Sequence, residues 1–538
     1  MNSSMRPARA RRYDIVFAGA GHNNLLTAAY AARAGHRVLV LEGAARIGGD
    51  TTSEELTLPG FIHDPCATAH NLIQSNPLMR YNELELDRYG LQYLFPDPVF
   101  TMPFLDGTCI TMWRDVDRTC AELARLSPTD ADAYRQLLAD WDLMSPVVNE
   151  ERANAPRPPN QVEARARASP LGAEMLAIRR ATALDVIKAR FKEEHVRAFF
   201  AWIAFMTLQP LDEPETGLLA FSLVAGRQRF SWILPEGGSI RLPLALAAII
   251  EEHGGSILTS KPVTRIALEG ERATAVETAD GSVYEAGEAI VSSIHIKHLP
   301  GIVGEEHLPA DYLVGVTRWK PNLTMFVSHY ALSEAPRFNA GRDSRASVTL
   351  GALESLDAYG TMLDAFRAGR IDIERPVFLA LTPSLIDPAR APSGQHTFKV
   401  ISFLPYELAE GPEHWDHIKK DVSNELFDRL SRLSPNLSRR IVLGEHIESP
   451  LDLERRNAAN WRGSCHGGAN SPDQSGYFRP VEGWSSYRTP IAGLYQNGAC
   501  THPGGSVSGL PGRNCAEVLL RDLGSSLEEA IGKRAAIT

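Results

Sequence analysis

The sequence predicts an α/β protein in which a Rossmann-like nucleotide-binding domain, containing a β-meander, is joined to a mixed α+β substrate domain. Three features predict this fold. A glycine turn lies between a short apolar strand and an alanine-rich helix within residues 13–33. Short β-rich segments occupy residues 256–293, and a glycine-dense loop at 498–512 runs into a helix. The nucleotide domain is therefore expected to draw on distant parts of the chain.

The first glycine turn has the surroundings that dinucleotide binding requires. Predicted strands at 13–18 and 37–41 enclose a helix at 25–33 that contains neither glycine nor proline. Gly19 permits the tight turn, and Gly21 lets the backbone approach a pyrophosphate. The helix that starts there points its free amide donors and the positive end of its dipole at those phosphates.

Glu42 ends the second strand, where its carboxylate can accept hydrogen bonds from the adenosine ribose hydroxyls. His22, Asn23 and Asn24 lie between the glycine turn and the predicted helix and are expected to contact the nucleotide. Asn24 stands where the pattern has a third glycine, which brings helix and strand close together. Either the helix lies slightly further from the sheet, or the Asn24 side chain is used locally.

A second glycine turn follows the ribose acid and indicates FAD, bound non-covalently, rather than NAD. Such a turn is expected where the nucleotide continues toward a flavin. Arg46 can place a guanidinium near a phosphate, although a surface salt bridge is the alternative. The candidate cofactor-binding residues of this turn are Arg46, Gly48, Gly49, Asp50 and Thr51.

The C-terminal loop at 498–512 is preceded by a predicted strand at 494–497 and followed by a helix at 514–520. Its exposed amides can stabilise negative charge on a reduced flavin ring, and a flexible surface loop is the alternative. Its candidate cofactor-binding glycines are Gly498, Gly509 and Gly512. Upstream, strands are predicted at 256–259, 263–268, 273–278, 282–284 and 289–293, with Asp280-Gly281 as a hairpin turn.

Composition excludes several classes of protein. The 538 residues are 44% hydrophobic and 22% charged, with a net charge of −10, which argues against nucleic acid as a partner. The six cysteines contain no Cys-x-x-Cys pair and favour a reducing, cytoplasmic location. The longest apolar run, 198–208, is too short to span a bilayer.

The stretch GAGHNNLLTAAYAARAGHRVLVLEGAARIGGDTTSEELTLPGFIHD resembles the FAD motif of phytoene-desaturase-like oxidoreductases. The branch most similar includes desaturase-type β-carotene ketolases and pyridine nucleotide-disulfide oxidoreductase domain-containing proteins. The segments 234–239, 487–495 and 498–514 continue this resemblance. It implies an FAD domain of the amine-oxidase-like (GR2) class and a backbone contact from Val263 to the adenine.

The resemblance also implies that His466 and His502 lie near the flavin or the substrate. A histidine suits proton transfer near neutral pH, and a purely structural role is the alternative for each. Cys500 is better explained as a small residue in a packed turn than as a covalent flavin link. His295 and His298 lack a third ligand nearby in sequence, so no metal site is predicted.

The FAD domain is predicted to be discontinuous, formed by 1–80, 228–300 and 466–538, and the substrate domain by 81–227 and 301–465. Residues 151–171, rich in Arg, Ala and Pro, are interpreted as an exposed linker or lid. The apolar segment 199–206 either lines a substrate tunnel or belongs to the ordinary core.

We therefore expect an FAD-dependent dehydrogenase or desaturase that transfers a hydride from an apolar, isoprenoid or carotenoid-like molecule to flavin N5. Only one dinucleotide motif is present, so oxygen or a quinone is the expected electron acceptor. An apolar substrate leaves room for transient contact with a membrane, and the oligomeric state is left open. The alternatives are a flavin-dependent carotenoid cis-trans isomerase, an amine oxidase, and a non-enzymatic lipid-binding escort protein of the same fold.

Overall fold

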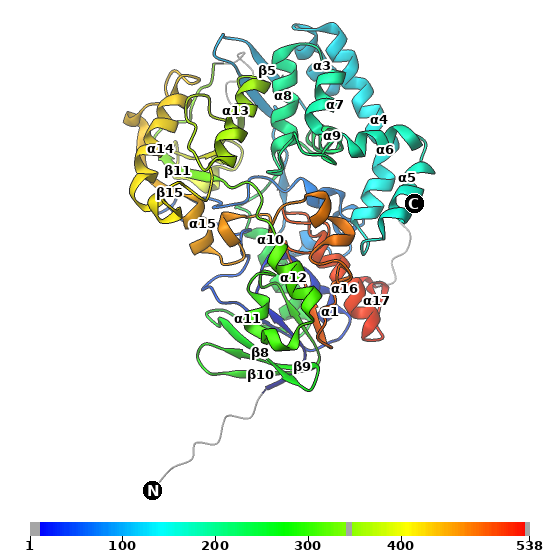
Figure 1. The fold of residues 1–538 in the computed structure, drawn as a ribbon. Coiled ribbons are helices and arrows are strands. Elements are labelled where there is room, and N and C mark those ends of the chain that lie inside the picture. Colours follow the sequence, from blue (N-terminus) through cyan, green and yellow to red (C-terminus); the bar gives the residue numbers. More distant parts are fainter. Residues whose placement is uncertain (1–10, 340–346, 533–538) are drawn as a thin grey trace.

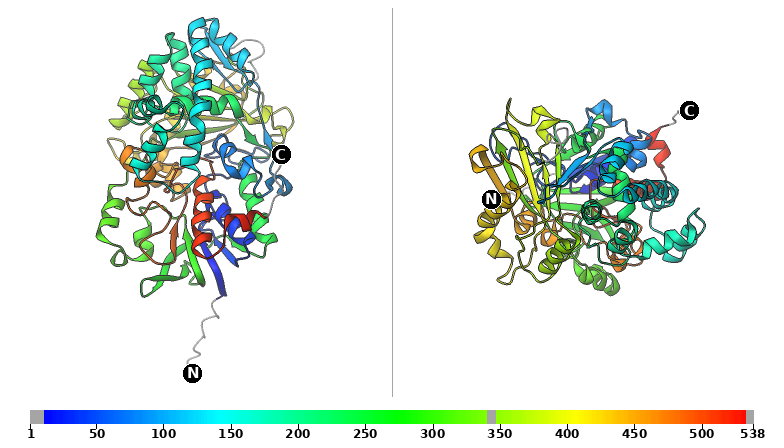
Figure 2. Two further views of the ribbon diagram at one scale, coloured as in Figure 1. Left: turned by 90° about the vertical axis from the view of Figure 1, so that its right-hand side faces the viewer. Right: turned by 90° about the horizontal axis from the view of Figure 1, so that it is seen from above.

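The computed structural model describes residues 11–339 and 347–532. Parts of the predicted domains, residues 1–10, 340–346 and 533–538, thus lie outside the described residues. Two lobes are stacked, each with its own sheet (Figure 1). The lobe with β8, β9, β10 and α1 contains segments from both ends of the chain, and the other lobe contains α3–α9, β11 and α14 (Figures 1 and 2).

The sheet of the first lobe has the order β7-β2-β1-β10-β9-β8, and β16 also pairs with β10. The strands β7, β2, β1, β10 and β16 are parallel, while β8 and β9 join β10 as an antiparallel meander. The strands are β1 (Arg11–Ala18), β2 (Val38–Leu41), β7 (Ser256–Leu258), β8 (Val263–Glu269), β9 (Arg272–Thr278), β10 (Val283–Ser292) and β16 (Leu494–Gln496).

Helices cover both faces of this sheet, so β1 and β2 are apolar on both sides. Ile15 and Phe17 pack toward one group of helices, while Val16 between them packs into a separate core on the opposite face. The first group comprises α1 (His22–Arg33), α10 (Arg241–Glu252), α16 (Leu510–Asp522) and α17 (Leu527–Ile531). The opposite face is covered by α11 (Leu299–Val303) and α12 (Ala310–Arg318).

Three predicted element boundaries were wrong. The first helix begins at His22 rather than at 25. The separate strands expected at 282–284 and 289–293 form one strand, β10, because pairing with β1 continues on both sides of Gly287. The C-terminal helix begins at Leu510 rather than at 514. Pro511 is compatible with this start because a proline in the first helical turn removes no intrahelical hydrogen bond.

The second lobe is built on a sheet with the order β15-β11-β14-β13-β12-β4-β5. Side chains alternate across it: Ile401 belongs to the core beside α8 and α9, whereas Val400 packs with α14 on the other face. The strands are β4 (Phe100–Pro103), β5 (Cys109–Met112), β11 (Phe326–Leu332), β12 (Thr349–Ala352), β13 (Phe378–Leu381), β14 (His396–Ser402) and β15 (Val442–Glu448). A separate pair is formed by β3 (Tyr93–Leu94) and β6 (Leu234–Pro235).

The helices of this lobe include part of the segment that we interpreted as an exposed linker or lid. Residues 151–171 contain the end of α4 and all of α5, and Arg157 and Arg165 pair with Glu150 across the turn between them. Alanine, arginine and glutamate favour helix, which accounts for the difference. The helices are α3 (Val116–Ala124), α4 (Pro128–Arg152), α5 (Pro159–Arg167), α6 (Gly172–Arg180), α7 (Ala183–Arg190), α8 (Glu194–Phe205), α9 (Leu219–Phe230), α13 (Leu356–Arg367) and α14 (Trp415–Ser431). Two shorter helices are α2 (Pro77–Arg80) and α15 (Pro450–Arg456).

The apolar segment at 199–206 is core rather than tunnel wall. Phe199, Trp202 and Phe205 of α8 are fully buried, and the Trp202 ring lies against Gly351 of β12, where a Cβ would be 2.8 Å from it. Only Met206, just after the helix, reaches the cavity described below. None of the helices in the described parts of the chain combines the length and apolarity needed to cross a bilayer.

A buried ion-pair network joins the two lobes. Arg390, fully buried, contacts Asp64 at 2.7 Å and Asp387 at 2.9 Å. Burial alone would raise the pKa of Asp64, but the Arg390 guanidinium and hydrogen bonds from Ser53 and the Ser239 amide lower it to about 2. Asp64 follows the second glycine turn, so this network fixes that turn relative to the second sheet.

Candidate functional site

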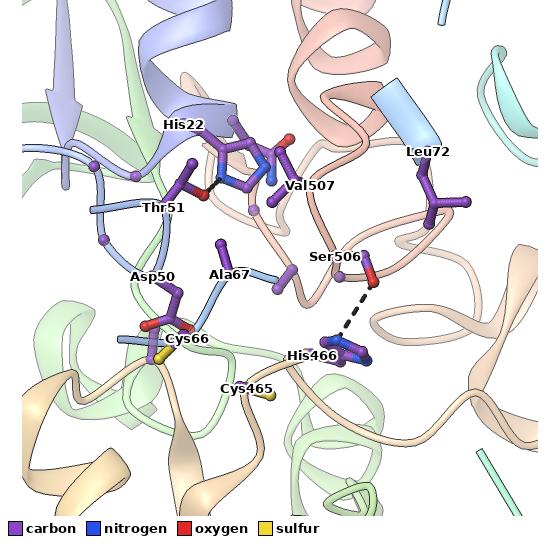
Figure 3. Close-up of a pocket in the computed structure, with 18 of the residues that line it drawn as sticks. His22, Asp50, Thr51, Cys66, Ala67, Leu72, Cys465, His466, Ser506 and Val507 are labelled. Carbon is purple, nitrogen blue, oxygen red and sulfur yellow. Dashed lines mark hydrogen bonds between the residues drawn. The ribbon is translucent and has the colours of Figure 1, made fainter. Parts of the chain in front are cut away.

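A cavity of about 1300 Å³ lies between the lobes and is lined by segments of both. Its volume exceeds the roughly 300–1,000 Å³ of common ligand pockets, so it has room for a dinucleotide together with a second molecule. One end is formed by the first glycine turn, Glu42 and Val263. The other includes the wall formed by Met325, Leu379 and Phe403 (Figure 3 shows part of the lining).

Most of the predicted cofactor residues line this one cavity. They come from β1–α1, the end of β2, the second glycine turn, β8 and the C-terminal loop, so the fold brings distant segments together as expected. The lining residues among them are Gly19, Gly21, His22, Asn23, Asn24, Glu42, Arg46, Gly48, Gly49, Asp50, Thr51, Val263 and Gly498.

The start of α1 is built to receive an anion. No side chain caps the helix at Gly21, and Gly21, His22, Asn23 and Asn24 face the cavity, so amides of the first turn remain free there. A Cβ built on Gly21 would meet no atom within 4 Å, although the residue has an ordinary φ of −64°. Glycine at this position therefore keeps space open in the cavity rather than serving the packing of the protein.

Gly19 has a different physical reason. Its φ is +99°, and a Cβ would lie 2.3 Å from the Ser293 hydroxyl, so glycine is required by the turn itself. Gly19 is therefore needed for the conformation of the turn, whereas Gly21 is needed for the open space beside it.

The Asn24 side chain is used locally, which decides between the two expectations for this position. It is fully buried, and its amide donates to the carbonyls of Ala18 at 3.1 Å and Gly19 at 2.9 Å. Its own oxygen accepts a 3.1 Å hydrogen bond from Asn497. Asn24 therefore ties the glycine turn to the C-terminal segment that enters the same cavity.

Glu42 lies at the predicted place but has partners of its own. Its carboxylate accepts hydrogen bonds from the backbone amides of Ala20 at 2.7 Å and Ala44 at 2.8 Å. These bonds hold the carboxylate at the cavity edge, where it has unused acceptor sites for ribose hydroxyls.

The second glycine turn packs against the first. Gly48 donates to the carbonyl of Ala20 at 2.9 Å, and the Thr51 hydroxyl contacts His22 Nδ1 at 2.9 Å (Figure 3). The other ring nitrogen of His22 is buried without a partner among the described residues, and burial lowers the pKa of His22 to about 4. The contact between the two turns therefore holds the neutral His22 imidazole, at the start of α1, beside the cavity.

Asp50, one residue past the paired glycines, is held by two amides. Asn457 and Asn460 donate to its Oδ1 at 2.9 and 3.1 Å. Burial raises the pKa of Asp50 despite these hydrogen bonds. Figure 3 places Asp50 beside Cys66 at the cavity.

Gly509 and Gly512 do not line the cavity, so we do not retain the prediction that they contact the cofactor directly. Gly512 lies where α16 crosses α1, and a Cβ there would be 2.4 Å from the Asn23 carbonyl. Gly509 precedes α16 with a φ of +64°. Both are explained by helix packing and helix start rather than by ligand contact.

The two candidate catalytic histidines separate in the structure. His466 lines the cavity: its Nδ1 donates to the Thr207 carbonyl at 2.9 Å, and its Nε2 accepts from the Ser506 hydroxyl at 3.3 Å (Figure 3). Burial lowers the pKa of His466 to about 4, which keeps the ring neutral at pH 7.

His502 lies outside the cavity lining, and its Nε2 donates to the Glu151 carbonyl at 3.0 Å. We therefore replace its predicted chemical role with a structural one. Cys500 likewise lies outside the lining and is buried. His295 and His298 line the cavity, but the described residues contain no group of three side chains able to hold a metal ion.

The charged residues around the cavity are mainly cationic. Six arginines line it among the described residues, against three carboxylates, Glu42, Asp50 and Glu54. Arg46 is exposed and takes part in none of the ion pairs found among the described residues, so its predicted alternative as a surface salt bridge is not realised. The six arginines are Arg46, Arg80, Arg152, Arg227, Arg229 and Arg456. This balance suits a ligand that carries a diphosphate.

Comparison with known proteins identifies the family. The model of the flavin containing amine oxidoreductases matches residues 25–321, more than half of the chain. The chain belongs to this family. Its cofactor is therefore FAD, and it is an oxidoreductase, as predicted. The uncapped α1 terminus, the open space at Gly21 and the cationic lining all fit an adenine dinucleotide.

Similar proteins agree with the branch of the family that the sequence resembles. Pyridine nucleotide-disulfide oxidoreductase domain-containing protein 2 of Rattus norvegicus is 28% identical over 97% of this chain and 95% of its own. One of the subunits of limonene dehydrogenase from Castellaniella defragrans is 26% identical over 97% and 96%. The neurosporene-forming phytoene desaturase of Cereibacter sphaeroides is 25% identical over 79% and 78%. The predicted resemblance is thus confirmed.

The predicted fold is also confirmed. The crystal structure of an oxidoreductase from Methanosarcina mazei superimposes with a TM-score of 0.60 over 95% of this chain and all of that one, at 17% identity.

Some cavity residues were missed by sequence reasoning. Asn71, Arg227 and the asparagines that hold Asp50 belong to no glycine motif, and the apolar wall is spread over separate segments from 206 to 403. The arginines that follow the largely apolar stretch 219–226 were the one signal available.

Proposed function

We propose that this flavin oxidoreductase acts on an apolar, isoprenoid-like small molecule by hydride transfer from a substrate carbon. The observation that carries the proposal is the wall that the second lobe contributes to the cavity. Alternation along β14 directs Ile401 and Phe403 to the same side, and the other wall residues are Met206, Leu208, Met325 and Leu379. Such a surface binds hydrocarbon by burial and offers a polar substrate few hydrogen bonds.

The names of two relatives support the same substrate class. Limonene and phytoene are both isoprenoids with few or no polar groups, and the relatives named for them align with most of this chain. We extend that chemistry to this protein as a class, without selecting one compound.

The residues that would hold the cofactor follow from the lining. Glu42 would bind the ribose hydroxyls, the α1 terminus and Arg46 the phosphates, and the Val263 backbone the adenine. The chemistry that FAD supplies when bound is acceptance of a hydride at N5 and transfer of the electrons to oxygen or a quinone. The apolar wall of the second lobe would keep water away from the reacting carbon.

His466 is the residue that we propose as proton acceptor. Donation from Nδ1 to the Thr207 carbonyl fixes the tautomer, so the lone pair of Nε2 is the proton-accepting site; the Ser506 hydroxyl that contacts it at 3.3 Å would have to release it to a substrate proton. Because the pKa of His466 is lowered to about 4, the ring is available as a neutral base across the physiological range.

Two other activities use the same cavity. An amine oxidase would have to bind an ammonium group among six arginines and only three carboxylates, which disfavours it electrostatically. A cis-trans isomerase would return a product of unchanged mass. The flavin-free escort interpretation is set aside, since the family is one of flavin enzymes.

The proposal is tested by mixing the yellow enzyme anaerobically with isoprenoid hydrocarbons and alcohols and, separately, with primary and secondary amines. We expect isoprenoids to bleach the flavin and to yield a product lighter by two hydrogens. Bleaching by amines alone would replace the proposal with an amine oxidase. An altered isoprenoid of unchanged mass would replace it with an isomerase.

The role of His466 makes a separate prediction. In the His466→Gln variant, flavin reduction by an active isoprenoid should slow by about 100-fold, the usual size of a lost general base. The spectrum of the bound flavin should be unchanged. The matched variant His502→Gln should reduce its flavin at the wild-type rate, because His502 lies outside the cavity. Equal rates in His466→Gln and the wild type would remove His466 from the mechanism.

A further inference from the structure

One arginine in the cavity is buried without a counter-charge. Arg227, on α9, is 8% exposed and lines the cavity. None of the described carboxylates forms an ion pair with it. Buried guanidinium groups are expected to be paired, so an unpaired one facing a ligand cavity points to a ligand that supplies the missing charge.

The surroundings of Arg227 hold it in place but do not neutralise it. Its guanidinium carbon lies 3.6 Å from the centre of the Trp232 ring, and one amino group donates to the Asn71 side-chain oxygen. The Asn71 amide in turn donates to the Ser231 carbonyl at 2.6 Å, which fixes its orientation. Burial lowers the pKa of Arg227 to about 9, so it stays positively charged at pH 7.

Two fully buried arginines elsewhere show what a structural role looks like in this chain. Arg390 is paired with two carboxylates. Arg479 donates to the carbonyls of His466, Ala469, Gln474 and Ala499 and to the side chain of Asn470. Arg227, in contrast, makes one hydrogen bond to the described residues, although a guanidinium has five N–H donors. Donors thus remain for a molecule in the cavity.

We propose that Arg227 binds a carboxylate carried by the substrate, so that the substrate class is an isoprenoid-like acid rather than a neutral hydrocarbon. The apolar part of such a molecule would lie against the wall formed by the second sheet, and its carboxylate would face the Arg227 guanidinium, which suits paired N–H···O bonds. That the substrate has an apolar skeleton rests on the proposed function, whereas that it carries a carboxylate rests on Arg227 alone.

The test uses a matched pair of probes, geranic acid and geraniol, which share one carbon skeleton and differ in the carboxylate. Each is titrated into the oxidised holoenzyme, and the dissociation constant is taken from the change in the flavin absorption spectrum and from calorimetry. We expect geranic acid to bind about 10- to 100-fold more tightly than geraniol, the range for a hydrogen-bonded ion pair. Equal affinity for the two would overturn the proposal.

Three variants assign the preference to Arg227. Arg227→Gln should lose the preference for the acid by the same factor while binding geraniol normally. Asn71→Asp should also lose the preference for the acid, because the new carboxylate would form an ion pair with the Arg227 guanidinium. Arg227 and its stacking on Trp232 remain intact in this variant. Arg229→Gln is the control, since Arg229 lies on the same helix and lines the same cavity but is paired with Asp142; it should keep the preference.

The variants also distinguish the substrate from the cofactor as the source of negative charge. If Arg227→Gln shifts the flavin spectrum or reduction potential but leaves the acid-to-alcohol ratio intact, Arg227 serves the flavin and the proposal is wrong. If geranic acid is preferred but no isoprenoid reduces the flavin, the acid site stands and the proposed function fails.

Discussion

Replacing Gly21 with valine should produce a folded protein that no longer retains FAD. A side chain at this position meets open space within the protein, and the φ of −64° and ψ of 154° suit a β-branched residue. The same space is where the uncapped amides of α1 are expected to meet the pyrophosphate. Overpacking a ligand contact typically costs about 1–3 kcal/mol, so we expect FAD affinity to fall by about 10- to 100-fold or more.

The measurement is the FAD content of the purified protein and the dissociation constant on reconstitution, with the far-UV spectrum as a check on folding. Gly360→Val is a matched control: Gly360 lies in α13, away from the cavity lining, and its Cβ would also meet nothing within 4 Å. It should remain yellow. A Gly21→Val protein with wild-type FAD affinity would show that the dinucleotide does not pass this residue.

The protein should lose stability steeply as the pH falls below about 6.5. Seven buried or half-buried histidines have a pKa lowered by burial to between about 2 and 4, against about 6.5 in an unfolded chain. Below pH 6.5 the unfolded state therefore binds protons that the folded state does not, so unfolding becomes easier as the pH falls. These residues are His22, His63, His70, His295, His329, His466 and His502.

Each such histidine weakens folding by up to about 1.4 kcal/mol per pH unit in this window. Together they should remove several kcal/mol between pH 7.5 and 5.5, a large part of the roughly 5–15 kcal/mol that stabilises a typical protein. The measurement is the free energy of unfolding in urea at a series of pH values. In His502→Gln the slope of the unfolding free energy against pH should be smaller by the contribution of about one proton. His253→Gln, at an exposed position, should leave the slope unchanged. A stability that stays flat from pH 7.5 to 5.5 would contradict the expectation.

The nucleotide half of the molecule was largely predictable because its chemistry depends on local backbone geometry. Gly19 and Gly48 adopt positive φ values, and the apolar strands around them pack on both faces. Such requirements involve neighbouring residues only, so the spacing of glycines, strand and acid was enough to predict the local structure of the proposed FAD site. Spacing along the chain did not reveal the structural reasons for glycine at two other positions: Gly509 starts α16 with a φ of +64°, and Gly512 lies where α16 approaches α1.

The two glycine turns, the acidic residue Glu42 and the parallel strands could be predicted from neighbouring residues, since each follows from contacts over a few positions. No local pattern predicts that His466 faces the cavity and His502 does not, that Asn24 reaches Asn497, or that Arg227 lacks a counter-charge among the described residues. These properties depend on which distant segments pack together and exclude water. Burial and the absence of a partner are set by that packing and not by the residue type.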